Sequence, residues 1–215
     1  MSRTVLAFVA AATLTSAATA ASAQVETSWF LHLGAALVTV DERAALEAGG
    51  VLVPGADVSI DSETTVAFEI GRFITPSVAV AFAGGFPPNF EVESAGTLSA
   101  LGRDGELLGG PAALTVQYHL RRGGRFHPYA GAGVGLLYVF ETKDGAVTDV
   151  EVDNKFGPVV QVGAVYRIAP RWGVFADYKK SWITTEARGN LGPAPIRADV
   201  RLDPAVYSLG LHRRF

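Results

Sequence analysis

The chain has 215 residues, no cysteine and a formal net charge of −3. The absence of Cys excludes thiol catalysis and a disulfide framework, and so weak and evenly spread a charge argues against nucleic acid as a partner. Hydrophobic residues make up 49% of the sequence and there are 24 glycines, yet no apolar run of helical length follows the N-terminal segment. This combination is typical of a barrel whose strands alternate in polarity.

Residues 1–23 predict a cleaved export signal. Arg3 supplies a positive start, a short apolar core follows, and Ala21-Ser22-Ala23 has the small-x-small pattern that precedes a cleavage site. The alternative, a helical transmembrane anchor, is disfavoured because the apolar stretch is too short and too rich in Ala and Thr. We therefore expect a mature domain of residues 24–215 that is exported through the periplasm.

The mature region predicts eight strands, at about 28–40, 64–74, 77–90, 111–120, 127–141, 156–168, 171–185 and 199–215. Three connections are short, at 75–76, 121–125 and 169–170. Four are long and rich in charge, Gly and Pro, at about 41–63, 86–110, 142–155 and 186–198. Short periplasmic turns and long extracellular loops are typical of outer-membrane barrels. The predicted fold is all-β, an eight-stranded antiparallel transmembrane β-barrel with both termini on the turn side.

The side chains of the predicted strands separate into an apolar face and a mixed face. In the strand at 171–185, for example, Trp172 and Val174 alternate with Phe175 and Asp177. This alternation fits lipid outside and a partly polar lumen inside. Aromatic residues also form two girdles: Trp29, Tyr118, Tyr166, Trp172 and Phe215 on the turn side, and Tyr138, Phe140, Tyr178 and Trp182 on the loop side. A soluble barrel, apolar inside and polar outside, is the disfavoured alternative.

Three motifs, in the same order, resemble the OmpW family. They are Leu-Thr-Val-Gln-Tyr-His-Leu at 114–120, Phe-His-Pro-Tyr-Ala-Gly-Ala-Gly-Val at 126–134 and Arg-Leu-Asp-Pro-Ala-Val-Tyr-Ser-Leu-Gly-Leu at 201–211. The last strand then presents an outward series that we expect the barrel-assembly machinery to read, namely Tyr207, Leu209, Leu211 and Phe215. Arg213 falls in the same phase, where members of the family usually have Tyr, and it interrupts that apolar series.

The resemblance covers essentially the whole mature chain and implies a channel for passive uptake of small hydrophobic molecules, with lateral release into the bilayer. Lipopolysaccharide is a poor solvent for such molecules, so an apolar funnel would help them cross the outer membrane. The expected partners are therefore outer-membrane lipid, lipopolysaccharide and a small hydrophobic solute. We expect a monomer without a cofactor.

Small residues are predicted to line the lumen wall of two strands, at Ala79, Ala81, Ala83, Gly131, Gly133 and Gly135. They could leave the upper barrel unfilled, although an eight-stranded barrel has little spare room. An equally weighted alternative is that they only permit tight curvature and packing around bulkier neighbours.

Three prolines predict a lateral exit between the third and fourth strands. Pro87 and Pro88 end the third strand, and Pro111 opens the fourth opposite them. Proline cannot donate to a strand ladder, so the pairing should break there. The alternative is that these prolines simply end the strands above the membrane. We favour the exit because a strand pattern resumes at Phe90.

A polar floor is predicted lower in the lumen, from residues in the inward phase: Glu69, Gln117, Gln161, Arg167, Asp177 and Lys179. Charges in a narrow, low-dielectric lumen must be compensated, so the two carboxylates should pair with Lys179 or Arg167. Such a floor would send a solute sideways. Alternatively, the same charges only fill and rigidify the barrel.

Two other functional classes are weaker. A lipid A-modifying barrel enzyme would need a Ser, a His and an acid close together, and the sequence offers only Ser208 near His212. No close cluster of His, Asp and Glu indicates a metal site. A closed structural or adhesive barrel would bind a host surface or phage through its loops, but the loop at 41–63 is unusually apolar for that purpose, with Leu46 and Leu52.

Overall fold

The computed structural model describes residues 28–97, 99, 103–120 and 124–215, so the predicted signal at 1–23 lies outside the described residues. Eight long antiparallel strands close into a barrel, as predicted. They are β1 (Trp29–Thr39), β5 (Glu63–Phe73), β6 (Val78–Gly85), β8 (Arg103–His119), β9 (Phe126–Asp144), β11 (Lys155–Arg167), β12 (Trp172–Ser181) and β15 (Ala205–Arg214). Among the described residues, no helix is long and apolar enough to cross a membrane.

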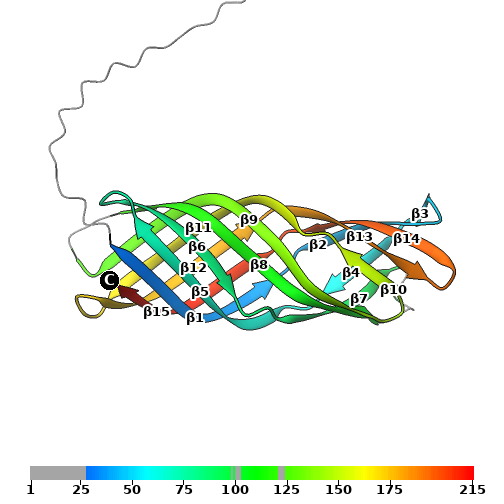
Figure 1. The fold of residues 1–215 in the computed structure, drawn as a ribbon, viewed down its shortest axis with the longest axis horizontal. Coiled ribbons are helices and arrows are strands. Elements are labelled where there is room, and N and C mark those ends of the chain that lie inside the picture. Colours follow the sequence, from blue (N-terminus) through cyan, green and yellow to red (C-terminus); the bar gives the residue numbers. More distant parts are fainter. Residues whose placement is uncertain (1–27, 98, 100–102, 121–123) are drawn as a thin grey trace, which may run out of the picture.

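Each barrel strand pairs with the barrel strands before and after it in the chain, and the barrel closes where the first strand, β1, pairs with the last, β15. The order runs β6-β5-β1-β15-β12-β11-β9-β8, and β8 pairs again with β6. The tight turns and the C-terminus lie together at one end of the molecule (Figure 1). The long connections all project from the other end.

Those long connections are strands rather than irregular loops, which corrects the prediction. They form β2 (Glu42–Ala48), β3 (Val51–Leu52), β4 (Ala56–Ile60), β7 (Asn89–Gly96), β10 (Thr148–Val152), β13 (Ile183–Leu191) and β14 (Ala194–Leu202). One sheet has the order β10-β13-β14-β2-β3, while β4 and β7 continue the barrel sheet beyond β8. We call these seven strands and the adjoining ends of β8 and β9 the extension (Figure 1).

The extension forms because its strands also alternate in polarity. Ile183, Val200 and Leu202 are 2–7% exposed and pack with Leu46 and Ile60 in a hydrophobic cluster. Burial of apolar surface stabilises such a cluster by roughly 25 cal/mol for each Å² removed from water. The predicted strands at 171–185 and 199–215 are therefore each divided, at Trp182 and at 203–204, between barrel and extension.

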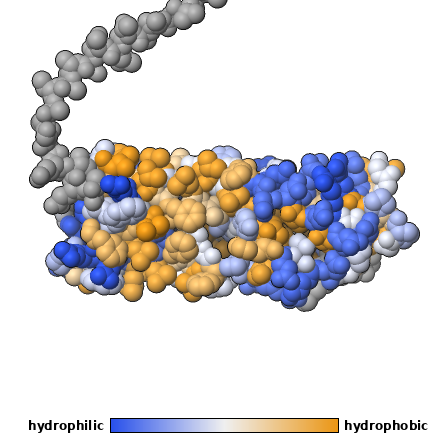
Figure 2. All heavy atoms as spheres, viewed as in Figure 1, coloured by the Kyte–Doolittle hydropathy of each residue, from blue (hydrophilic) through white to orange (hydrophobic). Residues whose placement is uncertain are grey.

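The outer surface of the barrel is apolar, whereas that of the extension is polar. Figure 2 shows hydrophobic residues over the half of the molecule that bears the turns and hydrophilic ones over much of the other half. Exposed side chains of the apolar half include Leu33 at 50%, Leu114 at 54% and Leu211 at 56%. A large exposed apolar band on a closed barrel is the surface that faces lipid.

Two glycines allow close contact between the first and last barrel strands. Gly34 of β1 pairs with Gly210 of β15, and a Cβ added at Gly34 would overlap the Leu209 carbonyl oxygen. We expect Gly34→Ala to cost about 1–3 kcal/mol of unfolding free energy, because the backbone must shift. Gly84→Ala is the control, since its Cβ would lie 3.5 Å from the nearest heavy atom. Urea unfolding of both variants measures the difference, and equal losses would contradict the expectation.

Candidate functional site

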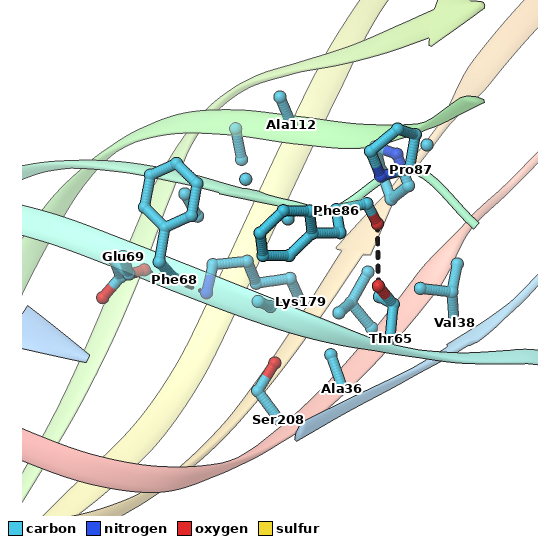
Figure 3. Close-up of a pocket in the computed structure, with 18 of the residues that line it drawn as sticks. Ala36, Val38, Thr65, Phe68, Glu69, Phe86, Pro87, Ala112, Lys179 and Ser208 are labelled. Carbon is cyan, nitrogen blue, oxygen red and sulfur yellow. Dashed lines mark hydrogen bonds and ion pairs between the residues drawn. The ribbon is translucent and has the colours of Figure 1, made fainter. Parts of the chain in front are cut away.

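We call the half of the barrel next to the extension its upper half and the half next to the turns its lower half. The upper half holds a cavity of about 360 Å³ (Figure 3). Ala36 of β1, Lys179 of β12 and Ser208 of β15 line it from the lumen side. Ala83 of β6 and Ala113 of β8 line it from the opposite side of the barrel. Small side chains from several strands therefore leave this part of the lumen unfilled.

The same cavity contacts residues of the lipid-facing surface. Phe68, Phe82, Phe86 and Phe140 line it, although their side chains are 38%, 45%, 73% and 61% exposed. Pro87 lies at the same end of the cavity as Phe86, close to Thr65 (Figure 3). The cavity is therefore lined both by lumen-facing and by outward-facing residues of the barrel wall.

Strand pairing between β6 and β8 is interrupted beside this cavity. The ladder between β6 and β8 ends at Ala83 and Ala113, and the ladder between β7 and β8 includes Asn89 and Leu108 at its barrel end. We call the stretch between them, residues 84–88 facing residues 109–112, the wall seam. Pro87 and Pro88 stand on one side of it and Pro111 on the other, and none of them has an amide hydrogen to donate.

Both edges of the wall seam remain paired with their other neighbours. On one edge, the Phe86 N–H donates to the Val66 carbonyl at 3.0 Å, and the Thr65 hydroxyl donates to the Phe86 carbonyl at 2.7 Å (Figure 3). On the other edge, residues 109–112 pair with β9. At the top of the seam the Gly109 N–H donates to the Pro88 carbonyl at 3.2 Å. The break is thus local to the wall between β6 and β8.

An ionic cluster crosses the lumen below the cavity. Lys179 Nζ lies 2.9 Å from Glu69 Oε2 and 2.5 Å from Asp177 Oδ1. The Gln161 amide donates to both carboxylates, at 2.8 Å to Glu69 and 2.7 Å to Asp177. The Gln117 amide donates to Glu69 at 3.1 Å. These five buried side chains, which we call the floor cluster, were all among the predicted floor residues.

Arg167 was also predicted to be in the floor, and this is wrong. It lies exposed at the turn-side end of β11, where its guanidinium donates to the Gly124 carbonyl at 2.7 Å. The prediction that alternate residues of β11 point inward is correct for Gln161. Arg167 follows the same alternation, but it lies at the end of the strand, beyond the closed part of the lumen. Lys179 therefore provides the ammonium group that lies between the two carboxylates.

Two residues that were not predicted, His32 and Tyr129, also contribute to the floor. His32 Nδ1 lies 3.1 Å from Glu69 Oε1, and the Tyr129 hydroxyl donates to Asp177 Oδ2 at 2.8 Å. The strand register gives the missing signal for His32, because it pairs His32 directly with Glu69 across β1 and β5. Below the floor, the ring of Phe30 is fully buried among other aromatic rings, which close the lower barrel.

The predicted lumen-wall residues divide into two groups. Ala83 lines the cavity, whereas Ala79 and Ala81 are buried lower in the barrel with Phe30 and Phe73. The glycines of β9 serve close packing: a Cβ at Gly133 would overlap the Leu114 carbonyl oxygen, and those at Gly131 and Gly135 would lie 3.0 and 2.8 Å from Val116 O and Ser181 Oγ. For most of these small residues, the structure favours the packing alternative.

The histidines are arranged for packing rather than for activating a serine. His212 Nδ1 lies 3.0 Å from His32 Nε2 inside the lower barrel, whereas Ser208 lines the upper cavity. Among the described residues, no group of three or more His, Cys, Asp or Glu could hold a metal ion.

Two smaller apolar cavities continue into the extension. One of about 30 Å³ shares Val38 and Pro111 with the large cavity and is also lined by Ile60 and Leu202. The other, of about 130 Å³, shares Ile60 and Leu202 with it and is lined further out by Leu46. Apolar space thus extends from the wall seam towards the outer end of the molecule.

The family model described as OmpW family matches residues 26–215. The chain belongs to the OmpW family. It is 36% identical over 170 residues to outer membrane protein AlkL of Ectopseudomonas oleovorans, covering 79% of this chain and 74% of that protein. It is 32% identical to the dibenzothiophene metabolism operon protein PahQ of Pseudomonas aeruginosa, covering 88% of this chain and 90% of that protein.

Solved structures of similar proteins have the same fold. The solid-state NMR structure of AlkL in lipid bilayers gives a TM-score of 0.72 at 32% identity and covers 100% of this chain and 97% of that one. The crystal structure of OprG from Pseudomonas aeruginosa gives a TM-score of 0.83, covering 89% of this chain and 97% of that one, but its 21% identity supports the fold alone. The chain is an outer-membrane β-barrel that lies in the lipid bilayer.

Proposed function

We propose that this barrel admits small hydrophobic molecules from outside and releases them sideways into the outer membrane through the wall seam. The observation that carries the proposal is the cavity of about 360 Å³, which is lined both by lumen-facing residues and by lipid-facing phenylalanines beside a break in the ladder. In lipid, unpaired backbone groups are tolerated where they line a cavity. The floor cluster would block a straight path to the periplasm.

The comparisons support a hydrophobic solute. One relative is named for a dibenzothiophene metabolism operon, and dibenzothiophene is an apolar aromatic molecule. The apolar cavities of the extension would give such a solute a path through the polar lipopolysaccharide layer. Recognition of the C-terminal strand by the barrel-assembly machinery and a monomeric state are part of the same proposal.

The direct test is uptake into liposomes that contain the refolded protein. An apolar tracer and a polar tracer of similar size are compared, and we expect the apolar one to enter faster. Ala83→Phe would fill the cavity and should slow apolar uptake, whereas Ala35→Phe adds the same bulk on the exposed lipid face of β1 and should not. Equal uptake of the two tracers, or equal rates in both variants, would contradict the proposal.

A further inference from the structure

Arginine is concentrated at the turn side of the barrel. Among the described residues, six arginines lie in or beside the turns and the C-terminus: Arg72, Arg125, Arg167, Arg171, Arg213 and Arg214. In contrast, the described residues of the barrel strands nearest this end, at 70–83, 113–120, 124–135, 159–176 and 205–215, include no Asp or Glu. The acidic residues of the described chain lie in the floor cluster, in the extension, or at the strand ends and connections next to the extension. The turn-side rim is therefore strongly cationic.

Two of these arginines face the lipid side of the wall. Arg72 on β5 and Arg213 on β15 are exposed and continue the outward phase of Ile70 and Leu211. An arginine in this phase at mid-membrane would be costly, but near a strand end its side chain reaches the interface. The interruption of the apolar series by Arg213 thus falls at the depth of the lipid headgroups.

Aromatic rings hold both guanidinium groups in place. The Arg72 guanidinium lies 5.6 Å from the centroid of the Trp29 ring. That of Arg213 lies 5.0 Å from the Trp172 ring and 4.9 Å from the Phe215 ring. Trp29 pairs with Arg72 across β1 and β5, and Trp172 pairs with Arg213 across β12 and β15. The five residues form a continuous patch over four neighbouring strands, which we call the arginine–aromatic patch.

The two arginines of the patch can bind an anion. Within the described part of the chain, no carboxylate forms an ion pair with Arg72 or Arg213. A guanidinium group that stacks on an aromatic ring keeps its N–H donors at its edges, where they can bind phosphate oxygens. Because the turn side is periplasmic, the lipid that meets this patch is the phospholipid of the inner leaflet.

We propose that the arginine–aromatic patch binds the phosphate of an anionic phospholipid, such as phosphatidylglycerol, in the periplasmic leaflet. The tryptophan rings and Phe215 contact the glycerol and upper acyl region, and Arg72 and Arg213 bind the phosphate. Bound lipid fixes the depth of the barrel in the membrane. This inference does not depend on the proposed transport function.

The test uses the refolded protein in phosphatidylcholine bilayers with a trace of spin-labelled phosphatidylglycerol or spin-labelled phosphatidylcholine. We expect the barrel to prefer the anionic label by about fivefold or more, because each arginine near a membrane surface contributes about that factor. Arg72→Gln with Arg213→Gln should remove most of the preference. The matched control is Arg43→Gln with Arg197→Gln, two exposed arginines of the extension, and it should keep the preference.

Two further measurements, a change of salt concentration and a competition with inorganic phosphate, complete the test. In the unmodified protein, raising the salt from about 20 mM to about 500 mM should weaken the preference, since the Debye length falls several-fold. Inorganic phosphate at matched ionic strength should not displace the lipid label, and displacement would overturn the assignment to lipid. No preference in the unmodified protein, an unchanged preference without Arg72 and Arg213, or its loss in the control would each refute the proposal.

Discussion

Lys179→Met is expected to lower the free energy of unfolding by about 3–5 kcal/mol, because it leaves two carboxylates buried without their shared cation. Lys179 contacts Glu69 at 2.9 Å and Asp177 at 2.5 Å, and all three side chains are at most 10% exposed. Met is similar in length and apolar, so the variant removes the charge with little change in packing. Urea unfolding in lipid vesicles, followed by tryptophan fluorescence, measures the loss.

The neighbouring Lys180→Met is the matched control for this prediction. Lys180 donates to the Asp203 carbonyl at 2.6 Å. Its replacement should therefore lower the free energy of unfolding by at most about 3 kcal/mol, the upper value for a hydrogen bond made by a charged group. A triple variant, Lys179→Met with Glu69→Gln and Asp177→Asn, removes all three charges together and should recover much of the stability. If Lys179→Met lost no more than Lys180→Met, the floor cluster would not be an essential ionic closure of the lumen.

The barrel itself could be predicted because its signals are local. Alternating polarity and short turns each depend on neighbouring residues, and all eight barrel strands were predicted in the right order. Their turn-side ends agree within a few residues, whereas β8 begins well before the predicted 111 and β6, β12 and β15 are shorter than predicted. The floor residues Glu69, Asp177 and Lys179 followed from the same alternation. Phase determines which face a side chain occupies, and a narrow lumen then forces inward charges to meet.

The extension could not be predicted in this way. Its strands pair with partners distant in sequence, as when β14 pairs with β2, and Gly and Pro residues within them favoured loops. Arg167 shows a second limit, because phase alone does not give height along the barrel axis. Gly133 shows a third: the space next to a glycine depends on how closely the neighbouring strand approaches.

The wall seam gives the second large expected effect: closing it should slow uptake of an apolar tracer about tenfold, which corresponds to a barrier about 1.4 kcal/mol higher. One variant replaces Pro87, Pro88 and Pro111 by Val, Thr and Val, which supplies amide donors so that β6 and β8 can pair across the seam. A second, Gly84→Trp, fills the outer mouth instead. A Cβ at Gly84 would lie 3.5 Å from Phe68 Cζ, so the backbone has room for a side chain.

The two variants act by different means, restored pairing and added bulk, so a shared loss would locate the exit at the seam. Ala35→Trp places the same ring on the exposed lipid face of β1 and should leave uptake unchanged. Retained apolar uptake in both seam variants would mean that solute leaves elsewhere, while the channel function would stand. Loss in Ala35→Trp as well would point to a general effect on the barrel. Ala83→Phe fills the cavity inside the barrel, which a solute reaches before the seam. If uptake slowed in this variant but not in the two seam variants, the solute would pass through the lumen and leave it at another place.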